Sequence, residues 1–304
     1  MFDFLRISTR SSKQGIEVYP RFRICKSSDL MIRGGDFYAI WLEARGMWST
    51  DEQDVLDMID YEVDKYAKEN KEILGDHPKI LHIRDSETRL IGQWHQFCQK
   101  DMRDSYHMLD EKLIFSNMPT SKKDYASKRL PYPLEKGSHD AYDRLMSVLY
   151  SPEERMKIEW AIGSIVSGDS KRLQKFMVLY GAAGTGKSTV LNIIQQLFEG
   201  YYSVFDAKAL GSSSNAFALE AFKTNPLVAI QHDGDLSRIE DNTRLNSLVS
   251  HEIMTVNEKF RPTYSNQFKA FLFMGTNKPV KITDAKSGLL RRLIDVSPSG
   301  EKLS

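Results

Sequence analysis

The chain has 304 residues, of which 27% are charged and 41% hydrophobic, a composition typical of a folded globular protein with room for about two domains. A formal net charge of +1 excludes a global basic field, so any contact with nucleic acid has to come from a local patch. Only two cysteines occur, outside any paired spacing, and no segment reaches the roughly 18 apolar residues that cross a bilayer. We therefore expect a cytoplasmic protein that has no disulfides and no membrane partner.

The first 115 residues predict a small α+β domain. Two apolar runs, 30–32 and 37–41, flank a glycine turn, which is typical of a β-hairpin. A capping box at Ser49 and Glu52 then predicts the start of an amphipathic helix, and a second helix is expected around residues 91–109. No pattern in this domain predicts a chemistry.

Residues 116–150 are polar, basic in places and interrupted by prolines, which favours a linker between two domains. After them, Ser151 and Glu154 flank a first-turn proline, which predicts a helix that ends near Gly168. This helix opens a C-terminal domain over residues 151–304. We expect it to pack onto the core of that domain through Met156, Trp160 and Ile165.

The most informative segment is a glycine-rich run that matches a phosphate-binding P-loop at every required position. It follows a candidate buried strand, 176–180, and precedes a helical pattern over 190–198. Its glycines allow backbone N–H groups and a helix N-terminus to converge on phosphate oxygens. Lys187 is then expected to reach the β- and γ-phosphates of a nucleoside triphosphate and Ser188 to hold Mg²⁺. The expected nucleotide-binding residues are Gly181, Ala182, Ala183, Gly184, Thr185, Gly186, Lys187, Ser188 and Thr189.

Two later strand ends carry polar residues that are expected at the same site. The run 227–230 predicts a buried parallel strand that delivers Asp233 and Asp235 at its carboxyl end, where such sheets bind ligands. Asp233 is expected to hold the metal, whereas Asp235 either activates the attacking water or caps a helix. A second run, 268–274, leads to Asn277, whose amide is expected to contact the attacking water or the γ-phosphate.

Two adjacent arginines follow near the end of the chain. A guanidinium from Arg291 or Arg292 against the γ-phosphate of a neighbouring subunit would stabilise the charge that develops during phosphoryl transfer. This interpretation requires a ring of subunits. Surface ion pairs are the alternative.

Taken in this order, the P-loop, Asp233, the segment 250–261, Asn277 and the arginine pair resemble the superfamily 3 helicases. More narrowly, they resemble the helicase portion of phage and poxvirus-type primase-helicases. The resemblance implies an α/β fold of the AAA+ type, a P-loop ATPase core with a parallel central sheet, and hexamers that move along single-stranded DNA at the expense of ATP. It also implies replication in a phage- or virus-infected or prophage-bearing cell, with a primase or polymerase as a further partner.

The resemblance also implies a hairpin that points into the central channel of such a ring. Lys259 and Arg261 lie at its place and would contact phosphates, while Phe260 or Tyr264 would contact a base or sugar. A solvated hairpin is the alternative. The chain departs from the family at Gly234, which separates two acids that the family often places side by side.

Two further hypotheses belong to other classes. An ATP-dependent initiator or loader would encircle DNA without unwinding it, and a small-molecule kinase would use the P-loop but not the basic residues that follow. The chain stops shortly after Arg292 in a polar tail, where related proteins usually continue. It is therefore expected to be a fragment of a longer primase-helicase, truncated at its C-terminus.

Overall fold

The computed structural model divides into two compact units, one of Met1–Leu109 with Pro119–Lys128 and the other of Asp110–Met118 with Arg129–Ser304. Of the stretch 116–150 that we expected to be a linker, residues 119–128 pack with the first unit. Most of the remainder packs with the second unit, where Asp140–Leu149 form helix α4. The structure describes residues 2–13, 15–23, 29–33, 37–86, 88–102, 105, 107–212, 215–234, 242–257, 263–278 and 288–301.

The first unit contains two small three-stranded sheets, of order β1-β2-β6 and β3-β4-β5. β1 and β2 form an antiparallel hairpin that β6 joins in parallel, and β3, β4 and β5 are antiparallel throughout. The β3–β4 pair confirms the hairpin predicted from its two apolar runs. The strands are β1 (Leu5–Ser12), β2 (Gly15–Phe22), β3 (Leu30–Arg33), β4 (Phe37–Leu42), β5 (Met47–Ser49) and β6 (Lys79–Ile80).

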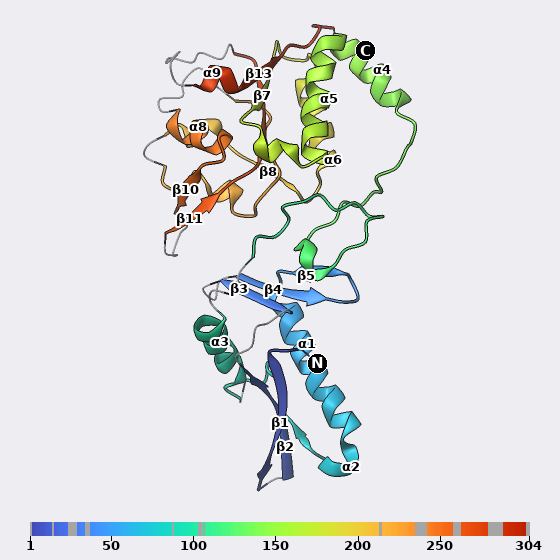
Figure 1. Cartoon of the computed structure of the whole chain (residues 1–304), viewed down its shortest axis with the longest axis vertical. Coiled ribbons are helices and arrows are strands. Elements are labelled where there is room, and N and C mark those ends of the chain that lie inside the picture. The colour runs from blue at the N-terminus through green and yellow to red at the C-terminus, as the bar shows by residue number, and fades with distance from the viewer. Residues whose placement is uncertain are drawn as a thin grey trace. The chain divides into compact units, whose positions relative to one another are not determined.

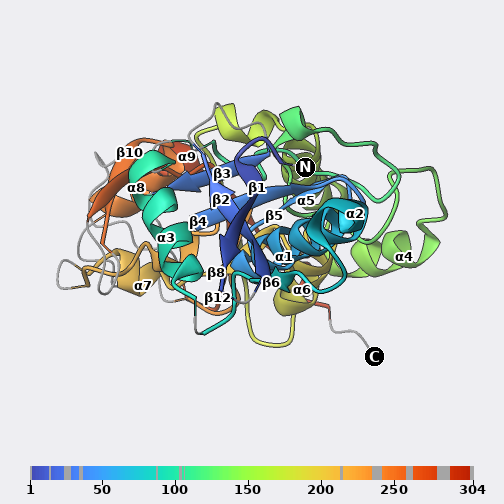
Figure 2. The ribbon, with the colours of Figure 1, turned by 90° about the horizontal axis from the view of Figure 1, so that it is seen from below.

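Helices α1 and α3 lie on opposite sides of the β1–β2 hairpin (Figures 1 and 2). The N-cap of α1 is Asp51, whose Oδ1 accepts from the amide of Gln53 at 2.9 Å. The predicted Ser49 cap is wrong, because the Ser49 hydroxyl instead donates to Asp54 Oδ2 at 2.5 Å. The helices of this unit are α1 (Glu52–Glu69), α2 (Lys71–Leu74) and α3 (Leu90–Asp101), with a 3₁₀ turn at Lys122–Asp124.

The predicted second helix is shorter than expected. α3 ends at Asp101 with Met102 as its C-cap, and the amide of Ser105 donates to the Met102 carbonyl at 2.9 Å. Met102 is 2% exposed and belongs to the core that Trp94 and Phe97 of α3 also fill. Its apolar side chain continues the helical pattern in the sequence, but Met102 is the C-cap at which α3 ends.

A five-stranded parallel sheet of order β13-β7-β12-β9-β8 organises the second unit. The α/β core with a parallel central sheet is therefore confirmed. A separate antiparallel pair, β10 and β11, lies outside this sheet. The strands are β7 (Phe176–Tyr180), β8 (Tyr202–Val204), β9 (Val228–Gln231), β10 (Ile253–Val256), β11 (Tyr264–Gln267), β12 (Phe271–Thr276) and β13 (Leu293–Val296).

Helices cover both faces of this sheet (Figure 1). Alternate residues of β7 show the division, because Met177 and Leu179 pack with α4, α5 and α6, whereas Phe176 and Val178 pack with α7, α8 and β10. No helix in the described part of the chain is long and apolar enough to span a membrane. The remaining helices are α5 (Pro152–Val166), α6 (Lys187–Leu197), α7 (Ala207–Leu210), α8 (Thr243–Val249) and α9 (Leu289–Arg292), with 3₁₀ turns at Asp169–Arg172 and Glu220–Phe222.

Helix α5 begins as predicted but presents a different face to the core. The Ser151 hydroxyl accepts from the Glu154 amide at 3.3 Å, and a proline occupies the first turn. Two of the three predicted core contacts are wrong, because Met156 is 68% and Trp160 45% exposed. The buried face instead follows the helical period through Ile158, Ala161 and Ile165.

Candidate nucleotide-binding site

The loop between β7 and α6 has the backbone conformation that its glycines suggest. Gly184 has φ +80° and Gly186, the N-cap of α6, has φ +84°, both in the left-handed region that favours glycine. The loop therefore turns sharply from the carboxyl end of a parallel strand into a helix of eleven residues. This places the amide groups of the first turn of α6 at the edge of the sheet where ligands bind in open α/β folds.

Lys187 is the first residue of α6, and its side chain folds back onto this loop. The residue is 7% exposed, and its Nζ donates to the carbonyl oxygens of Gly181 at 2.8 Å and Ala182 at 2.7 Å. Thr185 reinforces the curl, because its hydroxyl donates to the Ala182 carbonyl at 2.8 Å. Burial lowers the pKa of Lys187, and the negative charge of Asp233 acts in the opposite direction. The loop lysine and the acid after β9 therefore interact electrostatically.

The carboxyl end of β12 forms hydrogen bonds with two loops, the one that follows β7 and the one that follows β9. The Gly181 amide donates to the Thr276 carbonyl at 3.2 Å, and the Gly234 amide donates to the Gly275 carbonyl at 2.8 Å. β12 pairs with β7 on one side and β9 on the other, all in parallel. The structure therefore brings Lys187, Asp233 and Asn277 to one edge of one sheet.

Three of the predicted site residues have exposed side chains at this edge. Ser188, Asp233 and Asn277 are all exposed. Ser188 is the second residue of α6, next to Lys187, whereas Asp233 and Asn277 follow the ends of β9 and β12. Lysine, hydroxyl, carboxylate and amide groups from three loops thus share one edge of the sheet.

Gly275 is a residue of this site that sequence analysis missed. A Cβ at position 275 would lie 2.4 Å from the His232 carbonyl oxygen and 3.0 Å from Leu191 Cδ1. Only glycine lets the chain after β9 approach β12 this closely. A glycine inside an otherwise apolar strand indicates such an approach and was a usable signal.

Two residues outside the motif pack closely against the glycines of the P-loop. A Cβ at position 186 would lie 2.6 Å from Leu149 Cδ2, at the end of α4, and one at position 181 would lie 3.1 Å from Pro298 Cδ. The Ser299 amide donates to the Leu149 carbonyl at 2.8 Å, which joins the two supports. Leu149 and Pro298 come from segments without a recognisable motif, so no sequence pattern predicts this role.

The arginine pair lies at the opposite edge of the sheet. Arg291 and Arg292 end α9, which immediately precedes β13, and β13 runs parallel to β7. Lys175, just before β7, donates from its Nζ to the Arg291 carbonyl at 2.6 Å. The five residues of β7 separate this edge from the P-loop by about 15 Å. The fold does not bring the arginines to the nucleotide site of their own chain.

The two arginines differ in their surroundings. Arg291 is exposed, whereas Arg292 is 9% exposed and its Nη1 donates to Asn246 Oδ1 of α8 at 3.2 Å. The Nε of Arg292 is buried with no hydrogen-bond partner within the described residues. Arg291 is therefore the arginine that a second chain can reach.

Several predicted residues lie outside the described part of the chain. They are Asp235, Lys259, Phe260 and Arg261. The strands that flank the last three, β10 and β11, pair antiparallel with Val256 opposite Tyr264. This pairing is the one that a hairpin at this place requires.

Comparisons with known proteins address the fold more than the activity. The model of a family of unknown function (DUF5906) matches residues 179–292, less than half of the chain. That segment includes the P-loop, both polar strand ends and the arginine pair. No curated protein matches the sequence.

Among solved structures, the A-form apo structure of the NrS-1 C-terminal region is similar, with a TM-score of 0.51 and 12% sequence identity. The match covers 88% of this chain and 58% of that one. The apo structure of the same region gives a TM-score of 0.48 at 13% identity, covering 89% of this chain and 58% of that one. The chain thus spans less than two thirds of either NrS-1 structure, and the similarity to the A-form structure shows a shared fold.

We predict that Gly186→Ala destabilises the second unit more than Gly184→Ala. Both substitutions place alanine at positive φ, at a cost of about 1–2 kcal/mol. Only the alanine at 186 also meets Leu149, whereas nothing lies within 4 Å of a Cβ at 184. The clash adds about 1–3 kcal/mol, measurable by urea unfolding followed by circular dichroism. Equal destabilisation of the two variants would contradict the close contact between the P-loop and Leu149.

Proposed function

We propose that the chain binds and hydrolyses ATP at the edge formed by β7, β9 and β12, as the motor of a ring-forming DNA helicase. The observation that carries the ATPase proposal is the placement of Lys187. It lies inside a glycine loop at the start of a helix and interacts with Asp233, which follows a strand two positions away in the sheet. This combination suits an anionic ligand that also carries a divalent cation.

The residues at this edge fit a nucleotide with Mg²⁺. The backbone amides of the loop and Lys187 would hold the phosphates, with Lys187 exchanging its two carbonyl contacts for phosphate oxygens. Ser188 and Asp233 would hold Mg²⁺, which supplies neutralisation of the charge on the β- and γ-phosphates. The described residues contain no group of three or more His, Cys, Asp or Glu side chains arranged for a metal. Phosphate and water oxygens would complete the shell, as is usual for Mg²⁺.

The water that attacks the γ-phosphate needs a group to orient it. Asn277 is exposed at the end of β12, between the P-loop strand and the strand that leads to Asp233. Its side-chain oxygen can accept a hydrogen bond from the water, and its NH₂ group can donate one to a phosphate oxygen. We assign it this orienting role. Asp235 is proposed as the group that polarises the water.

The opposite positions of the P-loop and the arginines favour catalysis across a subunit boundary. We assign the contact with the γ-phosphate of the neighbouring subunit to Arg291, since it is exposed. We assign a positioning role to Arg292, since its guanidinium is buried against Asn246. A head-to-tail contact between identical chains closes into a ring, and a hexamer is the size that the helicase proposal implies. In such a ring, every nucleotide is completed by the next subunit.

The proposed track is single-stranded DNA. Lys259, Phe260 and Arg261 between β10 and β11 would contact it, two through phosphates and one through a base or sugar. The proposed setting is replication of a phage or virus-like replicon in its host cell, with a primase or polymerase as a partner. An initiator or loader that encircles DNA without unwinding it uses the same site and remains the second candidate.

We predict that Lys187→Ala lowers DNA-stimulated ATP hydrolysis at least about 100-fold, because it removes the cation that binds the β- and γ-phosphates. Strand separation on a forked duplex disappears with it. Lys223→Ala is the matched control, since Lys223 is an exposed lysine of the same unit whose one ion-pair partner among the described residues is Glu220. Hydrolysis by the Lys187→Ala variant at the rate of this control would contradict the assignment. DNA-stimulated hydrolysis without strand separation in either polarity would favour the loader.

We predict that two inactive variants, Lys187→Ala and Arg291→Ala, regain hydrolysis when they are mixed. Random assembly of equal amounts restores about a quarter of the interfaces, because each site takes its lysine from one chain and its arginine from the next. A mixture of Lys187→Ala with Asp233→Asn is the control, since both changes damage the same chain's half of the site. Hydrolysis that stays at background in the first mixture would show that no site is shared between chains.

A further inference from the structure

The face of the β1–β2 hairpin that points away from α1 is basic. In the antiparallel register, Arg6 lies opposite Arg21 and Arg10 opposite Glu17, so these side chains share one face of the hairpin. The other face is apolar and packs on α1, where Val18 contacts the core that includes Val63. On a chain with a net charge of +1, this face concentrates positive charge in one place.

Most of the positive charge on this face is not neutralised. Glu17, whose side chain is 10% exposed, is shared between two cations: Arg10 Nε at 2.5 Å and Lys79 Nζ, from β6, at 3.9 Å. Arg6 and Arg21 are exposed, and neither forms an ion pair with a described residue. Like charges directly opposite each other destabilise a sheet, so this arrangement carries a cost that a bound anion would offset.

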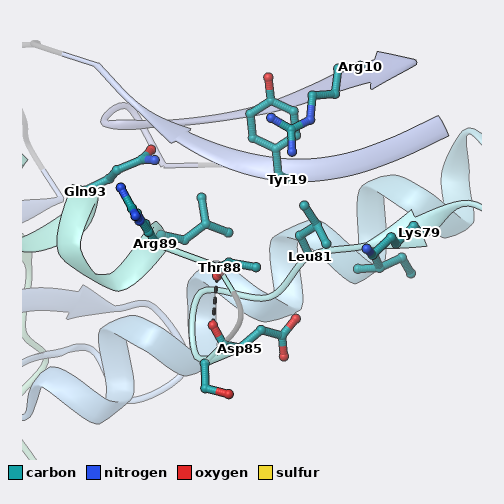
Figure 3. Close-up of a pocket in the computed structure, with 11 residues that line it drawn as sticks. Arg10, Tyr19, Lys79, Leu81, Asp85, Thr88, Arg89 and Gln93 are labelled. Carbon is teal, nitrogen blue, oxygen red and sulfur yellow. Dashed lines mark hydrogen bonds between the residues drawn. The ribbon is translucent and has the colours of Figure 1, made fainter. Parts of the chain in front are cut away.

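A pocket of about 670 Å³ adjoins this face (Figure 3). Arg10, Tyr19 and Lys79 line it from the sheet, and Arg89 and Gln93 line it from the start of α3. Arg89 forms no ion pair with a described residue. The residues that line the pocket include three cations, Arg10, Lys79 and Arg89, against one acid, Asp85, so basic groups are in excess.

Tyr19 gives the pocket an aromatic surface. The guanidinium of Arg10 lies over the Tyr19 ring, with its Cζ 5.3 Å from the ring centroid (Figure 3). The Arg10 side chain is 61% exposed and reaches the ring from the neighbouring strand. A nucleobase can stack on the same ring, because Tyr19 offers a base its π-face beside the cation that Arg10 supplies for a phosphate.

We propose that this basic face and its pocket bind single-stranded DNA, with Arg6, Arg21 and Arg89 contacting phosphates and Tyr19 stacking on a base. The proposal deepens the proposed function, because it rests on single-stranded DNA as the track and adds a second contact outside the ATPase unit. The distance between the cations indicates a ligand with several phosphates, as in a nucleic-acid strand, and not a single phosphate. Arg6 and Arg10 are about 13 Å apart along β1, too far for a single phosphate to contact both.

The test measures binding of a short fluorescein-labelled oligo(dT) strand to the full chain by anisotropy over a series of salt concentrations, without ATP. We expect Arg21→Ala to weaken binding severalfold and to reduce the slope of log affinity against log salt by about 0.7, as the loss of one phosphate contact does. Lys65→Ala is the control, because Lys65 is exposed on α1. An Arg21→Ala variant with the affinity and slope of the control would overturn the proposal.

A second pair of variants isolates the aromatic contact. Tyr19→Ala is expected to weaken binding about fivefold or more with the salt slope unchanged, while Tyr19→Phe keeps the affinity, because stacking needs the ring and not the hydroxyl. Ultraviolet crosslinking of oligo(dT) should label a peptide that contains Tyr19. If ATP displaces the strand from that peptide as well as unlabelled oligo(dT) does, the pocket takes a free nucleotide and the proposal fails.

This outcome is separable from the outcome for the ATPase site. A chain that bound oligo(dT) through Tyr19 and Arg21 but hydrolysed no ATP would retain this inference and refute the proposed motor.

Discussion

The carboxyl end of β12 is the constraint on which the candidate site depends. Its two last carbonyl groups accept hydrogen bonds from opposite sides, one from Gly181 of the P-loop and one from Gly234 of the loop that carries Asp233. Gly275 makes the second contact possible, because any side chain there would collide with the His232 carbonyl. A parallel sheet aligns strand ends but leaves loops free to diverge. Here two backbone hydrogen bonds, which need no ligand, hold both loops against the strand that lies between them. The fold itself therefore brings the lysine, carboxylate and amide groups together.

The same parallel sheet keeps the arginines away from that edge. Since α9 precedes β13 and β13 runs alongside β7, the chain direction places Arg291 at the amino end of the sheet. An arginine of the same chain is thus too far from the edge where we propose that the γ-phosphate lies. An arginine of a second chain could approach that edge from outside. Burial then distinguishes the two neighbours, because Arg292 is held inside its own unit by Asn246 and Arg291 is left at the surface. On the proposed function, a single polypeptide with this topology would hold one half of each of two sites.

Sequence analysis located the elements of the second unit well because they carry local signals. β7 coincides with its predicted apolar run, and Ser151 caps α5 as its capping pattern indicates. It failed where tertiary packing decides, as at Met156 and Trp160, whose apolar side chains face solvent on α5 while the buried face passes through Ile158. It also missed Leu149 and Pro298 behind the P-loop, since contacts between distant segments have no periodic signature. The basic face of the first unit escaped notice because its arginines are scattered in sequence, and only the hairpin register places Arg6 beside Arg21.

Electron microscopy of the chain with a slowly hydrolysed ATP analogue and single-stranded DNA is the most direct test of the central claim, that each nucleotide is completed by two chains. The account predicts closed rings in which the analogue lies between Lys187 of one subunit and Arg291 of the next, with DNA through the channel. A single chain that encloses the nucleotide by itself, or a ring in which both arginines point away from every phosphate, would contradict it.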